Sequence, residues 1–139
     1  MKVELLNGAN LAFIGDAYYE LRIRLYLVNK GITNQNELHK KCVEYVSAKA
    51  HAKIVNKMIN ESFLTLEEAD IYKRGRNHSY NLSRKNLNYN DYICSSGLEA
   101  VVGYLYLKEE KERLDEVISF AIKVVEEKDE EINCWEKRC

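Results

Sequence analysis

The chain has 139 residues, of which 46% are apolar and 31% are charged, and its net charge is −1 at pH 7. This length suits one domain with its own hydrophobic core. The composition and the absence of a long apolar run exclude a bilayer-spanning protein, and the first ten residues lack the features of a secretory signal. We therefore expect a cytoplasmic protein with no membrane partner, whose cysteines are reduced thiols because they lack disulfide or metal-binding spacing: Cys42, Cys94, Cys134 and Cys139.

Charge is distributed unevenly along the chain. Residues 40–85 carry ten basic and five acidic side chains, whereas residues 86–139 carry seven basic and thirteen acidic ones. A basic middle segment is typical of a surface that binds polyanions, although solvated helix faces give the same pattern. The charge pattern leaves both interpretations open.

The spacing of apolar residues predicts an all-α fold, because they recur at steps of three and four and the chain contains no proline. Residues 10–29 are the first predicted helix. Residues 33–62 are predicted to form one kinked helix or two short helices that meet near Ser47, with Thr33 or Asn34 as the cap. The stripe of the first helix that we expect to face the core is Leu11, Ile14, Tyr18, Leu21, Leu25 and Val28.

The second half of the chain also reads as helical. Thr65 and Glu68 have the spacing of a capping box, which predicts a helix from there to about Gly75. Residues 76–90 are rich in Asn, Ser and basic side chains without an apolar period, so we expect a surface loop. Two further helices are predicted, one beginning near Asp91 and one over residues 112–131, and no linker divides the chain into two domains.

Two acidic residues lie in otherwise apolar helical segments, each close to a glycine. Asp16 follows Gly15 in LAFIGDAYYEL (residues 11–21), and Glu99 lies one turn before Gly103 in SSGLEAVVGYLYL (residues 95–107). Glycine weakens a helix by about 1 kcal/mol relative to alanine, so its presence indicates close approach of another helix. If the two helices cross at these glycines, the carboxylates converge, and facing carboxylates are a recurrent site for Mg²⁺ or Mn²⁺.

Simpler explanations exist for the acidic residues. Asp16 and Glu20 share one helix face, where they either form an exposed polar surface or pair with Arg22 or Arg24. The histidines are too scattered for a zinc site and are expected on the surface: His39, His51 and His78.

The two glycine-bearing segments together resemble the paired signature helices of the ribonuclease III catalytic domain. YKRGRN (residues 72–77), with YVSAKAHAK before it, resembles the Mini-ribonuclease III branch of that family. The resemblance covers about residues 8–128 of a single catalytic domain and leaves residues 129–139 as a short tail. It implies an all-α, homodimeric helical bundle that cleaves double-stranded RNA with a divalent cation, leaves 5′-phosphate ends and acts in 23S ribosomal RNA maturation.

Carried over residue by residue, the resemblance assigns Asp16 and Glu99 to metal ligation and catalysis, with Mg²⁺ as the cofactor and Mn²⁺ as its substitute. Ala12 and Ser96 stand where longer relatives have carboxylates, which implies a metal site with fewer carboxylate ligands. Glu20 and Ser96 are expected next to the ligands, where Glu20 orients a metal-bound water or pairs with a basic residue. The alternatives are a catalytically idle RNA-binding or ribosome-associated protein on the same scaffold, and a helical interaction domain without an RNA role.

The resemblance also implies that this domain binds duplex RNA itself, because too few residues follow the acidic segment 126–131 for a separate RNA-binding domain. Such binding should be weak and steeply salt-dependent. Basic side chains near the C-terminal end of a helix also interact favourably with the helix dipole, which explains the basic segment equally well. Lys49, Lys53 and Lys57 form a stripe on one helix face that either extends the RNA-binding surface or is only solvated. A 23S rRNA precursor is the expected substrate, and a ribosomal protein or pre-ribosomal particle is a possible further partner. The predicted RNA-binding residues are Lys73, Arg74, Arg76, Asn77, His78, Arg84 and Lys85.

Overall fold

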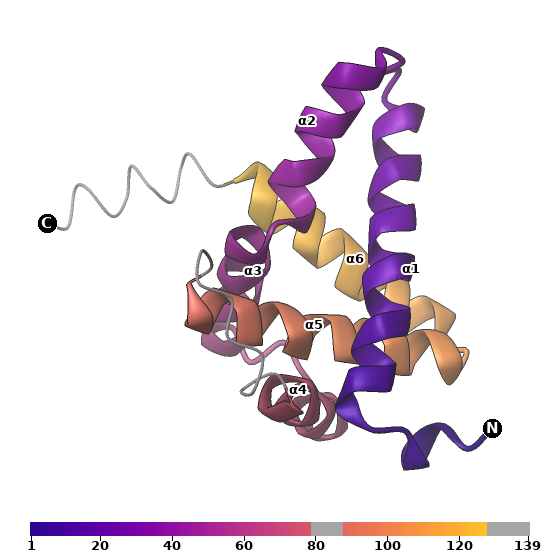
Figure 1. Ribbon diagram of the computed structural model, residues 1–139, viewed down its shortest axis with the longest axis vertical. Helices are drawn as coiled ribbons and strands as arrows, with labels where there is room; N and C mark the ends of the chain where they lie inside the picture. Colours follow the sequence, from indigo (N-terminus) through magenta and orange to yellow (C-terminus); the bar gives the residue numbers. More distant parts are fainter. Residues whose placement is uncertain (79–87, 128–139) are drawn as a thin grey trace, which may run out of the picture.

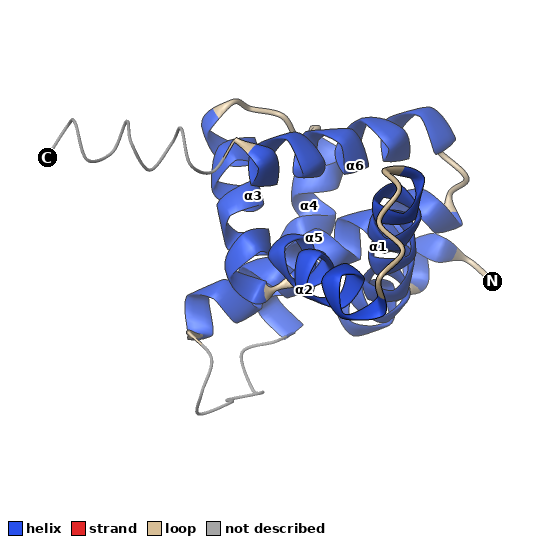
Figure 2. Ribbon diagram, turned by 90° about the horizontal axis from the view of Figure 1, so that it is seen from above, coloured by secondary structure: helices blue, strands red, loops and turns tan. Residues whose placement is uncertain are grey.

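The computed structural model describes residues 1–78 and 88–127, with only the backbone of His78. These residues form helices and no strand, which confirms the all-α prediction (Figure 2). None of the described helices is both long enough and apolar enough to span a bilayer. The elements are η1 (Val3–Leu5), α1 (Gly8–Asn29), α2 (Gln35–Val46), α3 (Ala48–Asn60), α4 (Leu66–His78), α5 (Tyr89–Leu107) and α6 (Lys111–Glu126).

Helix α5 is the centre of the fold (Figure 1). It contacts α1, α4, α3 and α6, and α1 crosses it steeply. An apolar helix surrounded in this way is buried on most sides rather than along one stripe. Its buried residues include Cys94, Ser96, Gly97, Leu98, Ala100, Val101, Val102, Gly103, Tyr104 and Leu105.

Side-chain caps fix where several helices begin. The Asn34 side chain accepts a hydrogen bond from the Glu37 N–H at 3.0 Å, which starts α2. Ser47 Oγ accepts one from the Ala50 N–H at 3.2 Å and starts α3, so of the two alternatives the structure shows two short helices. Thr65 and Glu68 form the predicted capping box, in which each side chain accepts from the other residue's N–H at 3.1 Å.

The prediction for the buried face of α1 was wrong. Leu11 is buried, but Leu21, Leu25 and Val28 are about half exposed. The helix carries apolar residues on most of its sides, so their period could not identify which side the rest of the chain covers. The buried face is Gly8, Leu11, Ala12, Gly15, Tyr19, Ile23 and Leu27.

The predicted loop at 76–90 was too long at both ends. Helix α4 continues to His78, and Gly75 packs so closely on α5 that a Cβ there would lie 2.6 Å from the Ser96 carbonyl oxygen. Helix α5 begins at Tyr89, because the Asn88 side chain accepts hydrogen bonds from the N–H groups of Asn90 and Asp91. Tertiary packing and a cap therefore extend both helices into a segment with no apolar period.

Candidate active site

Helices α1 and α5 cross at the two glycines singled out in the sequence. A Cβ on Gly15 would overlap the Glu99 carbonyl oxygen and would lie 2.7 Å from the Gly103 nitrogen. A Cβ on Gly103 would overlap the Leu11 carbonyl oxygen. Only glycine therefore permits this approach at either position, and the predicted close crossing is confirmed.

The crossing brings Asp16 and Glu99 together. Asp16 is exposed and Glu99 is partly buried, and a hydrogen bond joins the two side chains. Burial, the hydrogen bond to Asp16 and the Asp16 charge together raise the pKa of Glu99 to about 10. Without a cation, the pair is therefore stable with a proton on Glu99. A cation bound in place of this proton would neutralise the two carboxylates and remove the repulsion between them.

The donor set fits a hard cation with few protein ligands. The described residues contain no group of three or more His, Cys, Asp or Glu side chains that could hold a metal ion. An ion at Asp16 and Glu99 would therefore take its remaining ligands from water and from substrate phosphate, as Mg²⁺ commonly does. Ala12 and Ser96 are both buried, so the positions of the two absent carboxylates are not open to solvent.

Glu20 lies one turn after Asp16 but has a different partner. Its carboxylate accepts a hydrogen bond from Arg24 at 2.8 Å, within the same helix. Arg22 is directed elsewhere and binds Asp115 of α6 at 2.9 Å. Of the roles considered for Glu20, the structure shows the ion pair with Arg24.

His51 was expected on the surface, but it is 1% exposed. Its Nδ1 lies 2.7 Å from Ser95 Oγ, and its ring meets the Tyr19 ring edge-on at a centroid distance of 4.9 Å. Its Nε2 has no hydrogen-bond partner among the described residues. The position of His51 in the apolar spacing of α3, three and four residues before Ile54 and Val55, is the signal that could have identified it as buried.

The predicted RNA-binding residues that the structure describes lie near the end of α4. Lys73 and Arg74 are exposed, and Arg74 reaches back to the Glu4 carbonyl oxygen at 3.4 Å. Arg76 lies over the Tyr72 ring and donates to Asn77. Arg84 and Lys85 lie outside the described residues, as does the side chain of His78.

Comparison with known proteins agrees with this geometry. The family model described as Ribonuclease III domain matches residues 9–110, and the chain belongs to the ribonuclease III family. Within that family it is 47% identical over 124 residues to the Mini-ribonuclease 3 of Streptococcus pneumoniae, covering 89% of this chain and 97% of that one. It is 39% identical over 126 residues to the Mini-ribonuclease 3 of Staphylococcus aureus, covering 91% and 94%.

A solved structure supports the same assignment. The crystal structure of a Fusobacterium nucleatum protein superposes with a TM-score of 0.76 at 34% sequence identity, covering 86% of this chain and 93% of that one. The similarity therefore extends over nearly the whole helical domain. The resemblance to the Mini-type branch of the family is confirmed.

Proposed function

We propose that this chain is a divalent-metal-dependent endoribonuclease that cleaves double-stranded RNA at Asp16 and Glu99. Family membership supports the endoribonuclease activity, and the observation that carries the assignment of the site is the contact of these two carboxyl groups where α1 crosses α5. Mg²⁺ is the proposed cofactor and Mn²⁺ its substitute, because carboxylate and water oxygens suit both ions. The bound ion supplies a water of lowered pKa and stabilises charge on the scissile phosphate.

The residues of the chain contribute positioning. Asp16 and Glu99 would hold the ion, and the backbone contacts at Gly15 and Gly103 fix the distance between their helices. Each carboxylate therefore starts from a rigid helix rather than from a loop, which favours a reproducible geometry at the phosphate. Lys73, Arg74 and Arg76, with Asn77, provide exposed or partly exposed donors for the RNA backbone.

The active form is proposed to be a homodimer, since cleavage of both strands needs two sites. One face of α1 carries an exposed apolar stripe, defined as Phe13, Ala17, Leu21, Leu25 and Val28. Phe13 is 80% exposed and Leu25 is 50% exposed, on a helix whose opposite side is buried. An exposed apolar stripe of this length is typical of an interaction surface. A second copy of the chain is the occupant we propose.

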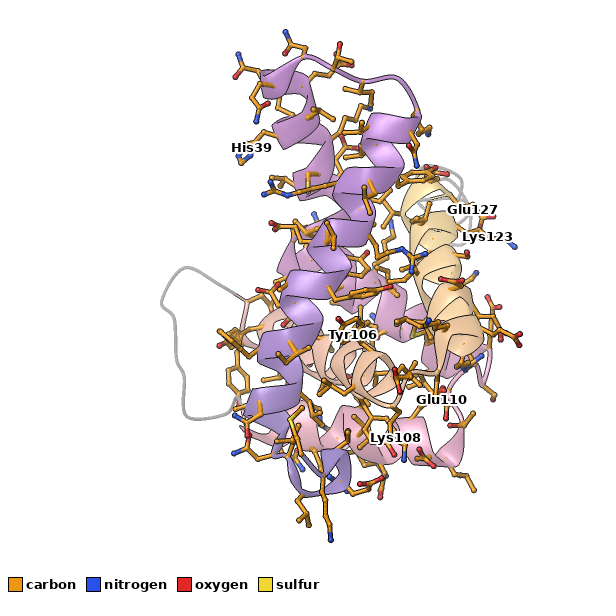
Figure 3. The ribbon with its side chains drawn as sticks, turned by 90° about the vertical axis from the view of Figure 1, so that its right-hand side faces the viewer. His39, Tyr106, Lys108, Glu110, Lys123 and Glu127 are labelled. Carbon is orange, nitrogen blue, oxygen red and sulfur yellow. The ribbon has the colours of Figure 1, made fainter. Side chains whose placement is uncertain are left out.

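Figure 3 faces this side of the molecule. Tyr106 extends from the end of α5 into the space between α1 and α6, where its ring packs against Tyr18 at a centroid distance of 4.7 Å. Beside α1, a cavity of about 570 Å³ lies against α6 and includes Arg22, Leu25 and Lys123 in its lining. The proposed dimer surface is therefore apolar along α1, with polar groups at its borders.

The biological substrate that we propose is a precursor of 23S ribosomal RNA, encountered free or in a pre-ribosomal particle. This follows from the resemblance to the Mini-type branch rather than from a contact in the structure. Cleavage of a 23S precursor transcript compared with an unrelated duplex of equal length would test it.

The decisive experiment incubates the full chain with a long duplex RNA, with and without Mg²⁺, beside Asp16→Asn and Glu99→Gln. We expect metal-dependent cleavage by the wild type and none by either variant. Glu112→Gln, which removes an exposed carboxylate in the first turn of α6, is the matched control and should cleave normally. Binding of duplex RNA without cleavage in Mg²⁺ or Mn²⁺ would instead favour the catalytically idle scaffold.

A further inference from the structure

The buried histidine His51 packs against a helical neighbour of each proposed metal ligand. Ser95, whose hydroxyl contacts Nδ1 at 2.7 Å, is one turn before Glu99 on α5. Tyr19, whose ring meets the imidazole edge-on, is about one turn after Asp16 on α1. The His51 ring is therefore packed between the two helices that carry the acidic pair, on a third helix that contributes no acidic residue to it.

The hydrogen bonds of the ring are incomplete. Nδ1 is occupied by Ser95, while Nε2 is buried and has no partner in the described part of the chain. A buried polar atom without a partner is costly and is uncommon in folded proteins, so Nε2 is a hydrogen-bonding group available to a partner that binds beside it. Burial lowers the pKa of His51 to about 4, so the ring is neutral near pH 7.

The charge that acts on this ring comes from Asp16. A neutral imidazole carries one N–H, and this N–H is on Nε2 when the Ser95 hydroxyl donates to Nδ1. In the cation-free protein Asp16 is engaged with Glu99. A cation held by both carboxylates would leave Asp16 with an oxygen lone pair that can accept a further hydrogen bond.

We infer that His51 is a positioning residue of this site, and that its free Nε2–H holds the Asp16 carboxylate in the cation-bound protein. Such a donor fixes the orientation of a ligating carboxylate and strengthens the site. In a site with only two carboxylates, this support has more effect than it would in a site with four. The inference rests on the proposed function, because it requires that Asp16 and Glu99 bind the cation.

The test measures Mn²⁺ binding to the full chain by isothermal titration calorimetry, without RNA. His51→Leu removes both ring nitrogens at similar volume, and His51→Gln keeps an amide that can donate. We expect His51→Leu to weaken Mn²⁺ binding about tenfold or more, and His51→Gln to recover most of it. Ile54→Val, an equally buried apolar change on α3, is the control and should bind Mn²⁺ like the wild type.

A second measurement remains informative if His51→Leu fails to fold. In ¹⁵N-labelled wild type, the His51 resonances should show the proton on Nε2, and addition of Mg²⁺ should shift Nε2 while Nδ1 stays in place. The Mg²⁺-induced shift should be absent in Asp16→Asn. A proton on Nδ1, or an Nε2 signal insensitive to Mg²⁺, would overturn the inference.

The outcomes separate this inference from the proposed function. If the wild type binds no Mn²⁺, both fail. If the wild type binds Mn²⁺ and Asp16→Asn does not, but His51→Leu binds as the wild type does, the proposed function stands and His51 has only a packing role.

Discussion

The side chains of Asp16 and Glu99 share a hydrogen bond where α1 and α5 cross, although the two residues are far apart in the chain. The contact depends on Gly15 and Gly103, which let the helix backbones touch beside the acidic groups. The same crossing thus organises the fold and the proposed active site. Changes at the crossing should affect both stability and activity.

Replacement of Gly15 or Gly103 by alanine should destabilise the fold by about 3 kcal/mol, because the new Cβ would overlap a carbonyl oxygen of the other helix. Helix propensity alone predicts the opposite sign, since alanine is the better helix former. Urea unfolding followed by circular dichroism measures the effect. The control is Ala9→Gly, at an exposed position near the start of α1 outside the apolar stripe, which should cost about 1 kcal/mol or less. A Gly15→Ala protein of unchanged stability would contradict the close crossing.

The stability of the cation-free protein should fall as pH rises. The pKa of Glu99 is raised from 4.5 to about 10 in the folded state, so the folded protein keeps a proton that the unfolded chain releases. Its favourable contribution is complete below pH 4.5 and is lost progressively between pH 4.5 and about 10. Urea unfolding in EDTA at several pH values should show this loss in the wild type, and it should be absent from Glu99→Gln.

The difference between the two proteins is the quantity to follow, because other groups titrate in both. Divalent cations should reduce the difference at high pH, since they favour the ionised pair. A difference that does not vary with pH would show that Glu99 is solvated rather than held next to Asp16.

Arg113→Met should destabilise the fold by about 3 kcal/mol or more. Arg113 donates two hydrogen bonds of 2.8 Å to Glu68, which is 4% exposed, and another to the Phe63 carbonyl oxygen. Without the guanidinium, the Glu68 carboxylate is left buried and unpaired.

The matched control is Arg22→Met, because Arg22 also binds an acidic residue but its partner Asp115 is mostly exposed. This change should cost less than about 1 kcal/mol. Thermal or urea unfolding distinguishes the two cases, and similar losses from both variants would mean that burial of Glu68 does not matter.

Leu21→Glu in the exposed apolar stripe of α1 should convert a dimer into a monomer, because a charge would be buried at the contact. Sedimentation velocity measures the change, and the monomer should lose coordinated cleavage of both strands. Ile59→Glu, at an exposed apolar position on α3, is the control and should remain dimeric. Dimers that persist in Leu21→Glu would place the interface elsewhere.

Lys73→Gln should weaken binding of duplex RNA and lower the slope of log affinity against log salt by about 1, if this exposed lysine contacts one phosphate. Filter binding with a catalytically inactive Asp16→Asn background measures it. Lys111→Gln, at the start of α6 beside Glu109 and Glu110, is the control and should leave the slope unchanged. Equal slopes for the Asp16→Asn parent and for the Lys73→Gln and Lys111→Gln variants made in it would exclude a phosphate contact at Lys73.

The sequence by itself determined the helices, several of their boundaries and the close approach of another helix at the glycines beside Asp16 and Glu99. Caps and capping boxes act over three or four residues, so Asn34 and the pair Thr65 and Glu68 were readable without the fold. A glycine beside an acidic residue in an apolar helix likewise carried its own signal, because glycine is unfavourable there unless another backbone is close.

Only the tertiary structure decided which groups are buried and how the charges pair. Helix α1 is apolar on most of its sides, so its period alone could not separate the core face from the exposed stripe. Burial of His51 depends on α1 and α5, which pack against this side chain of α3. Glu20 pairs with Arg24, one turn later on the same helix face, whereas Arg22 binds Asp115, which α6 brings from 93 residues away. Such choices depend on distances between helices, which local sequence does not specify.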